Sequence, residues 1–351
     1  MKLALAQLNY HIGNFEANEK KIIDTISEAK KNGADLVVFA ELSICGYPPR
    51  DFLQFEDFIL KCQESVHRIA KHCESIAAVV GSPSLNEKKK GKALHNSAYF
   101  LKDGKIESVH HKQLLPTYDV FDEYRYFEPA KDVQCISFKG KKIALTICED
   151  LWNIKGEFLY RNSPMKELSD EQPDFIINIA ASPFHTNQQA ERQKVFAWNS
   201  KKYNAPIYYV NHIGAQTELI FDGGSGCFFK DQYISKASYF EESIQYFNTE
   251  KKESTTETIS TVQKFELIEK ALITGIHDYF RKLNFKNATL GLSGGIDSAL
   301  TLVLAVKALG KENVIPILMP SQFSSDHSIS DSIELCENLG CQYHQIEIEE
   351  I

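Results

Sequence analysis

The feature that most constrains how this chain folds is the alternation, over residues 1–240, of short apolar runs with amphipathic segments. Runs such as residues 76–82 and 175–181 are rich in β-branched side chains and too short for buried helices. Residues 55–73 repeat apolar side chains at helical spacing, and a further helix is expected at residues 189–203. Fully apolar strands separated by helices are typical of a layered α/β domain. The sequence therefore predicts an α/β fold.

The same pattern gives local predictions. Asn14 precedes a segment in which Ile22 and Ile26 recur at helical spacing, so its side chain is expected to cap that helix. Residues 36–42, LVVFAEL, are expected to form one buried strand that closes on an acid. Asp-Gly at residues 103–104, between two strand-like runs, predicts a hairpin turn.

A second region follows residues 241–262, whose polar composition predicts a linker. From residue 263 onward, helices alternate with short apolar strands, the last at residues 343–348. Strands connected through helices form βαβ units and hence a parallel sheet. Only about three strands are present, whereas doubly wound domains usually contain about five or more. Residues 263–351 are therefore expected to be the N-terminal part of a truncated Rossmann-like domain.

Composition and charge narrow the class of protein. Hydrophobic residues make up 43% and charged residues 25% of the chain, as in a globular domain with a packed core. The formal net charge of −8 makes nucleic acid and anionic membranes poor partners. The N-terminal apolar run is interrupted by Gln7 and Asn9, so it does not predict a secretion signal. The eight cysteines show no metal-finger spacing, and because no secretion signal is predicted we expect reduced thiols and a cytoplasmic location.

Three polar residues lie at the ends of predicted strands, where α/β sheets place ligands and reactive groups. Cys148 follows residues 143–147, Glu41 closes LVVFAEL, and Lys112 follows residues 106–111. A lone cysteine is more often a packing residue, and a lone acid or lysine is usually at the surface. However, a buried carboxylate or ammonium is costly unless it is paired. The three side chains would satisfy one another if they converged.

Three segments carry a specific family resemblance: FAELSICGYPPRD at residues 39–51, HHKQLLPTYDVFDEYRYF at 110–127 and ALTICEDLW at 144–152. They resemble the signature segments of the nitrilase superfamily, and in detail those of the glutaminase domain of the glutamine-dependent NAD synthetase family. The resemblance covers essentially the whole chain, in order. It implies a nitrilase-like αββα sandwich for residues 1–240 and part of an ATP-pyrophosphatase NAD synthetase domain after the linker.

The resemblance also implies a mechanism for the strand-end residues. Cys148 would attack an amide carbonyl as a thiolate, whose formation is favoured by a neighbouring cation such as Lys112. Lys112 and the backbone N–H after Cys148 would stabilise the negative oxygen of the tetrahedral intermediate. Glu41 would act as general base, deliver the proton to the departing ammonia and activate the hydrolytic water. This half of the protein is expected to need no cofactor.

Further residues are assigned to the same site by the resemblance. Glu123 is expected beside Lys112 as a secondary catalytic candidate, although a loop ion pair between Glu123 and Arg125 is an equally good interpretation. Tyr118 and Glu149 match positions that contact the α-amino group of glutamine. These assignments predict that the three signature segments meet at one site.

The resemblance is incomplete where the α-carboxylate of glutamine should bind. Ser182 matches the contacting serine, but related sequences usually carry Lys or Arg six residues later, where this chain has Gln188. Arg192 follows one helical turn further on. Either the carboxylate contact has moved or the specificity for glutamine is weaker. Gln188 is kept as a glutamine-binding candidate.

A glycine-rich turn in the second region is the other candidate site. The sequence LGLSGGIDSAL, at residues 290–300, leads from a predicted strand into a helix. Two glycines let the backbone approach a ligand closely, and the free N–H groups of a helix N-terminus favour anions. The turn resembles the phosphate loop of ATP-pyrophosphatases. By that resemblance Asp297 would be a Mg²⁺ ligand, and ATP would be bound by Ser293, Gly294, Gly295, Ile296, Asp297 and Ser298.

By this resemblance, the two candidate sites imply a member of the glutamine-hydrolysing NAD synthetase family, whose members are carbon–nitrogen ligases with glutaminase activity. Its partners would be small molecules: L-glutamine, ATP and deamido-NAD, which is amidated to NAD. The truncated chain is expected to keep only the glutaminase half, and the resemblance implies homo-oligomers. The alternative is a stand-alone nitrilase-family amidase with a non-catalytic C-terminal module. A third interpretation, a non-catalytic scaffold, requires that Glu41, Lys112 and Cys148 do not converge.

Overall fold

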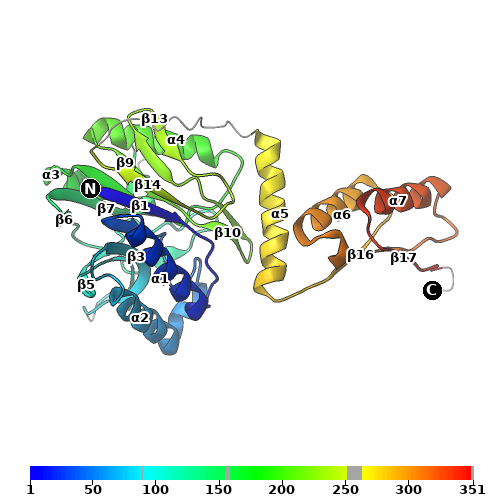
Figure 1. Ribbon diagram of the computed structural model, residues 1–351, viewed down its shortest axis with the longest axis horizontal. Helices are drawn as coiled ribbons and strands as arrows, with labels where there is room; N and C mark the ends of the chain where they lie inside the picture. Colours follow the sequence, from blue (N-terminus) through cyan, green and yellow to red (C-terminus); the bar gives the residue numbers. More distant parts are fainter. Residues whose placement is uncertain (89, 155–158, 251–262, 349–351) are drawn as a thin grey trace. The chain divides into compact units, whose positions relative to one another are not determined.

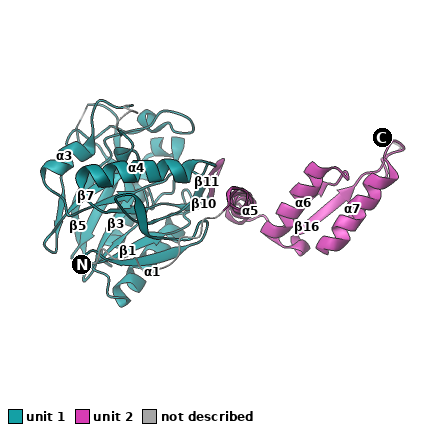
Figure 2. Ribbon diagram, turned by 90° about the horizontal axis from the view of Figure 1, so that it is seen from above, with its two compact units in different colours: residues 1–214, 221–261 teal, residues 215–220, 262–351 magenta. Residues whose placement is uncertain are grey.

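The computed structural model describes residues 1–88, 90–154, 159–250 and 263–348. The chain divides into two compact units (Figure 2). Unit 1 comprises residues 1–214 and 221–261, and unit 2 comprises residues 215–220 and 262–351. No helix within the described ranges is long and apolar enough to cross a membrane.

Unit 1 is built on two six-stranded mixed sheets within the described residues, and each sheet has three parallel strands at its centre (Figure 1). The first sheet has the order β14 (Ser243–Asn248), β1 (Lys2–Gln7), β2 (Leu36–Val38), β3 (Ala77–Leu85), β4 (Leu94–Lys102), β5 (Lys105–His111). The second has the order β13 (Gln232–Lys236), β12 (Gly226–Phe229), β9 (Ile207–Val210), β8 (Phe175–Ile179), β7 (Lys141–Ile147), β6 (Ile136–Phe138). A hairpin of β10 (Ile213–Gln216) and β11 (Leu219–Asp222) follows β9.

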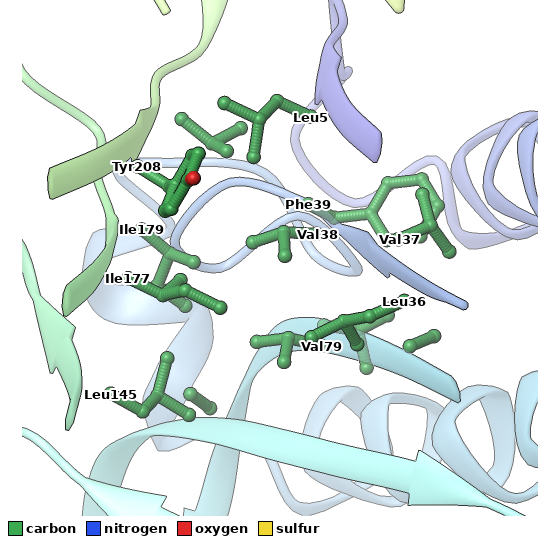
Figure 3. Packing of buried hydrophobic residues seen from close by; sticks show 14 of the residues in the cluster. Leu5, Leu36, Val37, Val38, Phe39, Val79, Leu145, Ile177, Ile179 and Tyr208 are labelled. Atoms are coloured by element: carbon green, nitrogen blue, oxygen red, sulfur yellow. The ribbon is translucent and has the colours of Figure 1, made fainter. Parts of the chain in front are cut away.

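Helices cover the outer faces of the two sheets. The first sheet is covered by α1 (Phe15–Lys31) and α2 (Glu56–Ala70), and the second by α3 (Pro164–Asp170) and α4 (Gln188–Tyr203) (Figure 1). Side chains of both sheets pack into one buried cluster that includes Leu5, Val38, Leu145 and Ile177 (Figure 3). Burying each such side chain contributes about 1.5–3 kcal/mol. The nitrilase-like αββα sandwich is thus confirmed.

The structure tests the local predictions. The Asn14 side chain accepts a hydrogen bond from the backbone N–H of Ala17 (3.2 Å), which confirms it as the N-cap of α1. The hairpin at residues 103–104 joins β4 to β5, also as predicted. The strand expected at residues 36–42 is shorter, because regular pairing ends at Val38 and the chain leaves the sheet.

The predicted start of the linker at residue 241 was wrong. Residues 243–248 form β14, which pairs antiparallel with β1 at the edge of the first sheet. Ile244, Tyr246 and Phe247 pack against the core of unit 1, so these residues are part of the domain. A short edge strand contains too few apolar side chains to stand out from polar neighbours by composition. Residues 251–262 of the predicted linker lie outside the described residues.

Unit 2 contains the predicted parallel sheet, in the order β15-β16-β17. Its small core includes Leu302, Val314 and Cys336. The last strand is shorter than predicted, although the backbone N–H groups of Ile346 and Ile348 still bond to carbonyls at and after the end of β16. The elements are α5 (Lys264–Lys282), β15 (Ala288–Gly291), α6 (Ile296–Leu309), β16 (Val314–Leu318), α7 (Asp326–Leu339) and β17 (His344–Gln345).

Candidate active site

The strand-end residues of unit 1 meet at one edge of the sandwich. Glu41 follows β2, Lys112 follows β5 and Cys148 follows β7. The Nζ atom of Lys112 lies 2.7 Å from Oε1 of Glu41, and neither side chain has any exposed surface. Because β5 runs antiparallel to β4, and β4 antiparallel to β3, the ends of β2, β3 and β5 point the same way. The sheet topology therefore brings the acid and the lysine together.

The backbone around Glu41 is held tightly. Leu42, the next residue, has a left-handed conformation with φ 47°, which is uncommon for a leucine. A Cβ atom on Gly81 of β3 would lie 2.6 Å from the Ala40 carbonyl oxygen and 2.8 Å from the Glu41 carbonyl carbon. Only glycine therefore allows this approach of the two chains. The Oε2 atom of Glu41 accepts a hydrogen bond from the Ala181 backbone N–H (2.9 Å).

Glu123 joins the cluster instead of forming a loop ion pair. Its two carboxylate oxygens lie 2.8 and 2.9 Å from Nζ of Lys112. The Tyr47 hydroxyl donates to the same carboxylate (2.9 Å). Arg125, the other partner considered for Glu123, lies 3.2 Å from the Asp51 carboxylate at the surface. The structure thus places Glu123 where the family resemblance implied.

Asn96 was missed by the sequence analysis. Its side-chain nitrogen donates to Oε1 of Glu41 (2.7 Å) and to Oε2 of Glu123 (3.2 Å), so it bridges the two carboxylates. The register of the β4–β5 hairpin places Asn96 opposite Lys112, whose backbone N–H donates to the Asn96 carbonyl (2.8 Å). Counting back from the Asp-Gly turn would have paired Asn96 with His111, because the register of the hairpin shifts by one residue between Phe100 and Leu101.

The buried Lys112 ammonium lies between the carboxylates of Glu41 and Glu123. Burial alone would lower the pKa of Lys112, but the carboxylates of Glu123 and Glu41 outweigh it and raise that pKa well above its ordinary value. Burial raises the pKa of Glu123, and the Lys112 ammonium opposes the shift. Lys112 therefore stays protonated at neutral pH and can stabilise negative charge that develops beside it.

Cys148 is a neutral thiol in this environment. It is buried, with φ 42°, a left-handed backbone conformation that costs about 1–3 kcal/mol in a non-glycine residue and is often found at functional sites. Burial and the nearby Glu41 carboxylate raise the pKa of the thiol well above its ordinary value, against the opposing effect of Lys112. Lys112 thus favours the thiolate, as the sequence analysis expected, but burial and Glu41 outweigh it in the resting site. The electrostatic interaction of Cys148 with Glu41 and Lys112 contradicts the scaffold interpretation.

The first pair of predicted glutamine contacts forms next to the nucleophile. The Tyr118 hydroxyl lies 3.0 Å from both carboxylate oxygens of Glu149. The Tyr160 hydroxyl donates to the same carboxylate (3.0 Å), a contact that sequence reasoning did not find. Burial raises the pKa of Glu149, while Lys112 and the two hydroxyls oppose the shift. Such an acid, adjacent in sequence to Cys148, is suited to a cationic amine.

The second pair of predicted glutamine contacts, Ser182 and Gln188, lies near Glu41, which accepts the backbone N–H of Ala181, the residue before Ser182. The Gln188 side-chain nitrogen donates to the Ser182 hydroxyl (2.7 Å), and both residues are buried. Arg192, which might have replaced the missing cation, forms a buried ion pair with Asp222 and donates to the Gly223 carbonyl (3.0 Å). A carboxylate contact moved to Arg192 is therefore not supported. Gln188 is the residue that stands beside Ser182.

The glycine-rich turn of unit 2 is open. Gly294 has φ 79°, and a Cβ there would lie 2.6 Å from Cα of Ser328 at the start of α7, so this position needs glycine. The hydroxyls of Ser293 and Ser298 lie 3.1 Å apart across the turn. Asp297 is exposed in the first turn of α6. Two serine hydroxyls, a helix N-terminus and an exposed carboxylate fit a phosphate group with a hard cation.

Comparison with known proteins identifies the architecture. The carbon–nitrogen hydrolase family model matches residues 2–228, well over half of the chain. The chain belongs to the carbon–nitrogen hydrolase family. The NAD synthase model matches residues 268–351, which correspond to most of unit 2. The presence of both matches favours a two-domain protein over a stand-alone amidase.

Several relatives match this carbon–nitrogen hydrolase over nearly its whole length. The glutamine-dependent NAD(+) synthetase of Synechocystis sp. is 40% identical over 99% of this chain and 64% of its own length. That of Thermotoga maritima is 34% identical over 100% of this chain and 66% of its own length. The chain thus spans just under two thirds of the relatives it matches.

Solved structures agree with the fold of this carbon–nitrogen hydrolase. A glutamine-dependent NAD+ synthetase from Acinetobacter baumannii, solved in complex with ADP, has a TM-score of 0.91 and 33% identity, and the match covers 99% of this chain and 65% of that one. An amidase of the nitrilase superfamily from Nesterenkonia has a TM-score of 0.60 and 18% identity, over 70% of this chain and 89% of its own. The second similarity supports the fold of unit 1 only.

Proposed function

We propose that unit 1 hydrolyses the side-chain amide of L-glutamine, and that unit 2 takes part in the ATP-dependent amidation of deamido-NAD to NAD with the ammonia released. The observation that carries the first part is the buried cluster of Glu41, Lys112 and Glu123 beside Cys148 in a carbon–nitrogen hydrolase fold. The second part rests on the NAD synthase match and on the relatives named above.

The neutral thiol determines the order of proton transfers. Glu41 accepts the Cys148 proton as the sulfur attacks the amide carbon and a C–S bond forms. The oxygen becomes negative, and Lys112 and the backbone N–H after Cys148 stabilise it. Collapse of this intermediate breaks the C–N bond, and Glu41 returns its proton to the leaving ammonia. Water, deprotonated by Glu41, then hydrolyses the thioester and restores the thiol.

Recognition of glutamine follows from the two flanking pairs. Glu149, oriented by Tyr118, would bind the α-amino group as a charge-assisted partner. Ser182 and Gln188 would donate neutral hydrogen bonds to the α-carboxylate. Since neutral donors hold a carboxylate less strongly than a cation does, this arrangement predicts a high KM for glutamine.

In unit 2, the residues of the turn would hold the phosphates of ATP. Mg²⁺, when bound, would neutralise phosphate charge, and Asp297 is its proposed ligand. Ser293 and Ser298 would donate their hydroxyls to phosphate oxygens, and Gly294 and Gly295 let the chain approach them. Homo-oligomer formation remains a prediction from the family resemblance, and a cytoplasmic location remains a prediction from the N-terminal sequence and the cysteines.

Ammonia release from L-glutamine tests the proposal. The purified chain should release ammonia, and a Cys148→Ala variant should release none while unfolding at the same denaturant concentration. Cys62→Ala is the matched control, because Cys62 is another buried thiol but lies on α2. Release that persists in the Cys148 variant would refute the assigned nucleophile. Release from other amides but not glutamine would refute the substrate.

A further inference from the structure

One buried carboxylate connects the two segments that carry the lysine and the nucleophile. Asp150 lies two residues after Cys148 and is 4% exposed. Its Oδ1 atom accepts hydrogen bonds from the backbone N–H groups of Gln113 (3.0 Å) and Leu114 (2.9 Å). Its Oδ2 atom accepts from the backbone N–H of Ile147 (3.0 Å). A single side chain thus binds three N–H groups from two distant parts of the chain.

These N–H groups flank the reacting residues. Gln113 directly follows Lys112, at the end of β5 in the first sheet. Ile147 directly precedes Cys148, at the end of β7 in the second sheet. Asp150 therefore links the two sheets at the active-site edge. It also anchors the residue before Cys148, whose left-handed backbone needs support from its surroundings.

We propose that Asp150 is a positioning residue for the amide hydrolysis assigned to this site. By holding the chain on both sides of the site, it fixes the separation of the Cys148 sulfur and the Lys112 ammonium. The inference rests on the proposed function and deepens it, because it names what sets the catalytic geometry. Small misplacements of reacting groups lower rates strongly, by about 100-fold for 1 Å.

The three hydrogen bonds that Asp150 accepts, from Gln113, Leu114 and Ile147, form a clamp that should respond to pH. Burial raises the pKa of Asp150 to about 6, against the backbone N–H groups and the Lys112 ammonium. Lys112, which follows β5, is the cation whose charge acts on Asp150, and Cys148 and Glu149 are its titratable neighbours in sequence. Below this pKa, one carboxylate oxygen becomes a hydroxyl and a poor acceptor, so one side of the clamp weakens. Activity should therefore fall below about pH 6. Folding stability should change in the opposite direction. Because the pKa of Asp150 is raised to about 6 in the folded state, its contribution to the free energy of unfolding is present in acid and is lost as pH rises through about 6.

The decisive variant is Asp150→Asn, which keeps the size of the side chain but turns one acceptor into a donor. We expect kcat for glutamine to fall by about 100-fold, with KM changed by less than about threefold. The acidic limb of the kcat profile near pH 6 should disappear, a change that a purely structural role would not produce. Asp174→Asn is the matched control, because Asp174 accepts the backbone N–H of Lys142 (2.8 Å) at the opposite end of β7. Its kcat and pH profile should match those of the parent chain.

Hydrogen exchange of the parent chain provides a second test if Asp150→Asn does not fold. Protection of the peptide amides around residues 113–114 and 147, corrected for intrinsic rates, should drop between pH 7.5 and pH 5, while the amide of Lys142 stays protected. Unchanged protection, or a variant with normal kcat and a normal acidic limb, would overturn the proposal. If the parent chain releases no ammonia at all, the proposed function fails, whereas the exchange data still decide whether the clamp exists.

Discussion

The two candidate sites of this chain differ in how they are held. In unit 1, Glu41 and Lys112 have no exposed surface and are joined by a direct hydrogen bond between segments that follow two separate strands. In unit 2, the residues of the glycine-rich turn are largely exposed, and Ser293 and Ser298 bond to each other within the turn. The first site is fixed by its own side chains, and the second is free to fit a ligand.

The difference follows from the energetics of burial. A buried ion costs several kcal/mol unless its partners are in place, so removing one partner exposes the full penalty. An exposed hydroxyl or carboxylate is satisfied by water and loses little when a neighbour changes. Unit 1 should therefore be sensitive to single changes at its site in both stability and activity, and unit 2 should not.

Lys112→Met should have the largest effect. It leaves the carboxylates of Glu41 and Glu123 buried without their cation, so the free energy of unfolding should fall by about 3–5 kcal/mol. Denaturant unfolding measures this, and ammonia release should be lost. The control is Lys20→Met, which removes an exposed lysine paired with Asp24 and should change stability by less than about 0.5 kcal/mol. Equal losses in the free energy of unfolding for Lys112→Met and Lys20→Met would contradict the difference between the buried and the exposed lysine.

Gly81→Ala should come next. The added Cβ would collide with the backbone of Ala40 and Glu41, so we expect a loss of about 1–3 kcal/mol in stability and a displaced acid. Gly295→Ala in the turn of unit 2 is the matched change, because a Cβ there meets only the Ser293 hydroxyl at 3.5 Å. Unfolding curves of the two variants should separate, with Gly295→Ala close to the parent. A neutral Gly81→Ala would contradict the tight approach at Glu41.

Ser298→Ala should have the smallest effect. Its hydroxyl bonds to Ser293 within an exposed turn, so the free energy of unfolding should change by less than about 1 kcal/mol. Ammonia release from glutamine should be unaffected, since the turn belongs to the other unit. A stability loss as large as that of Lys112→Met would show that the turn is as firmly held as the site of unit 1.

Much of the site in unit 1 could be predicted because burial restricts its chemistry. An acid, a lysine and a cysteine at the ends of apolar strands must pair, and the resemblance of their flanking segments gave the same trio. Asn96 and Asp150 were missed because their partners lie far away in sequence and depend on strand register. Tyr160 was missed because its contact with Glu149 depends on the course of the loop between them.

The other features that the sequence did not reveal have a similar origin. The protonation state of Cys148 depends on burial and on three nearby carboxylates, which a lysine in the sequence does not reveal. Strand β14 was assigned to a linker because its pairing with β1 depends on residues about 240 positions away. In each case local composition was outweighed by a long-range contact.

Covalent labelling by a glutamine analogue with an electrophilic group at the amide position tests the central claim most directly. Mass spectrometry of the digested chain would locate the adduct among the eight cysteines. The account predicts modification of Cys148 alone, abolished by Lys112→Met or Glu41→Gln and suppressed by excess L-glutamine. An adduct on another cysteine, or labelling of Cys148 that L-glutamine does not suppress, would contradict it.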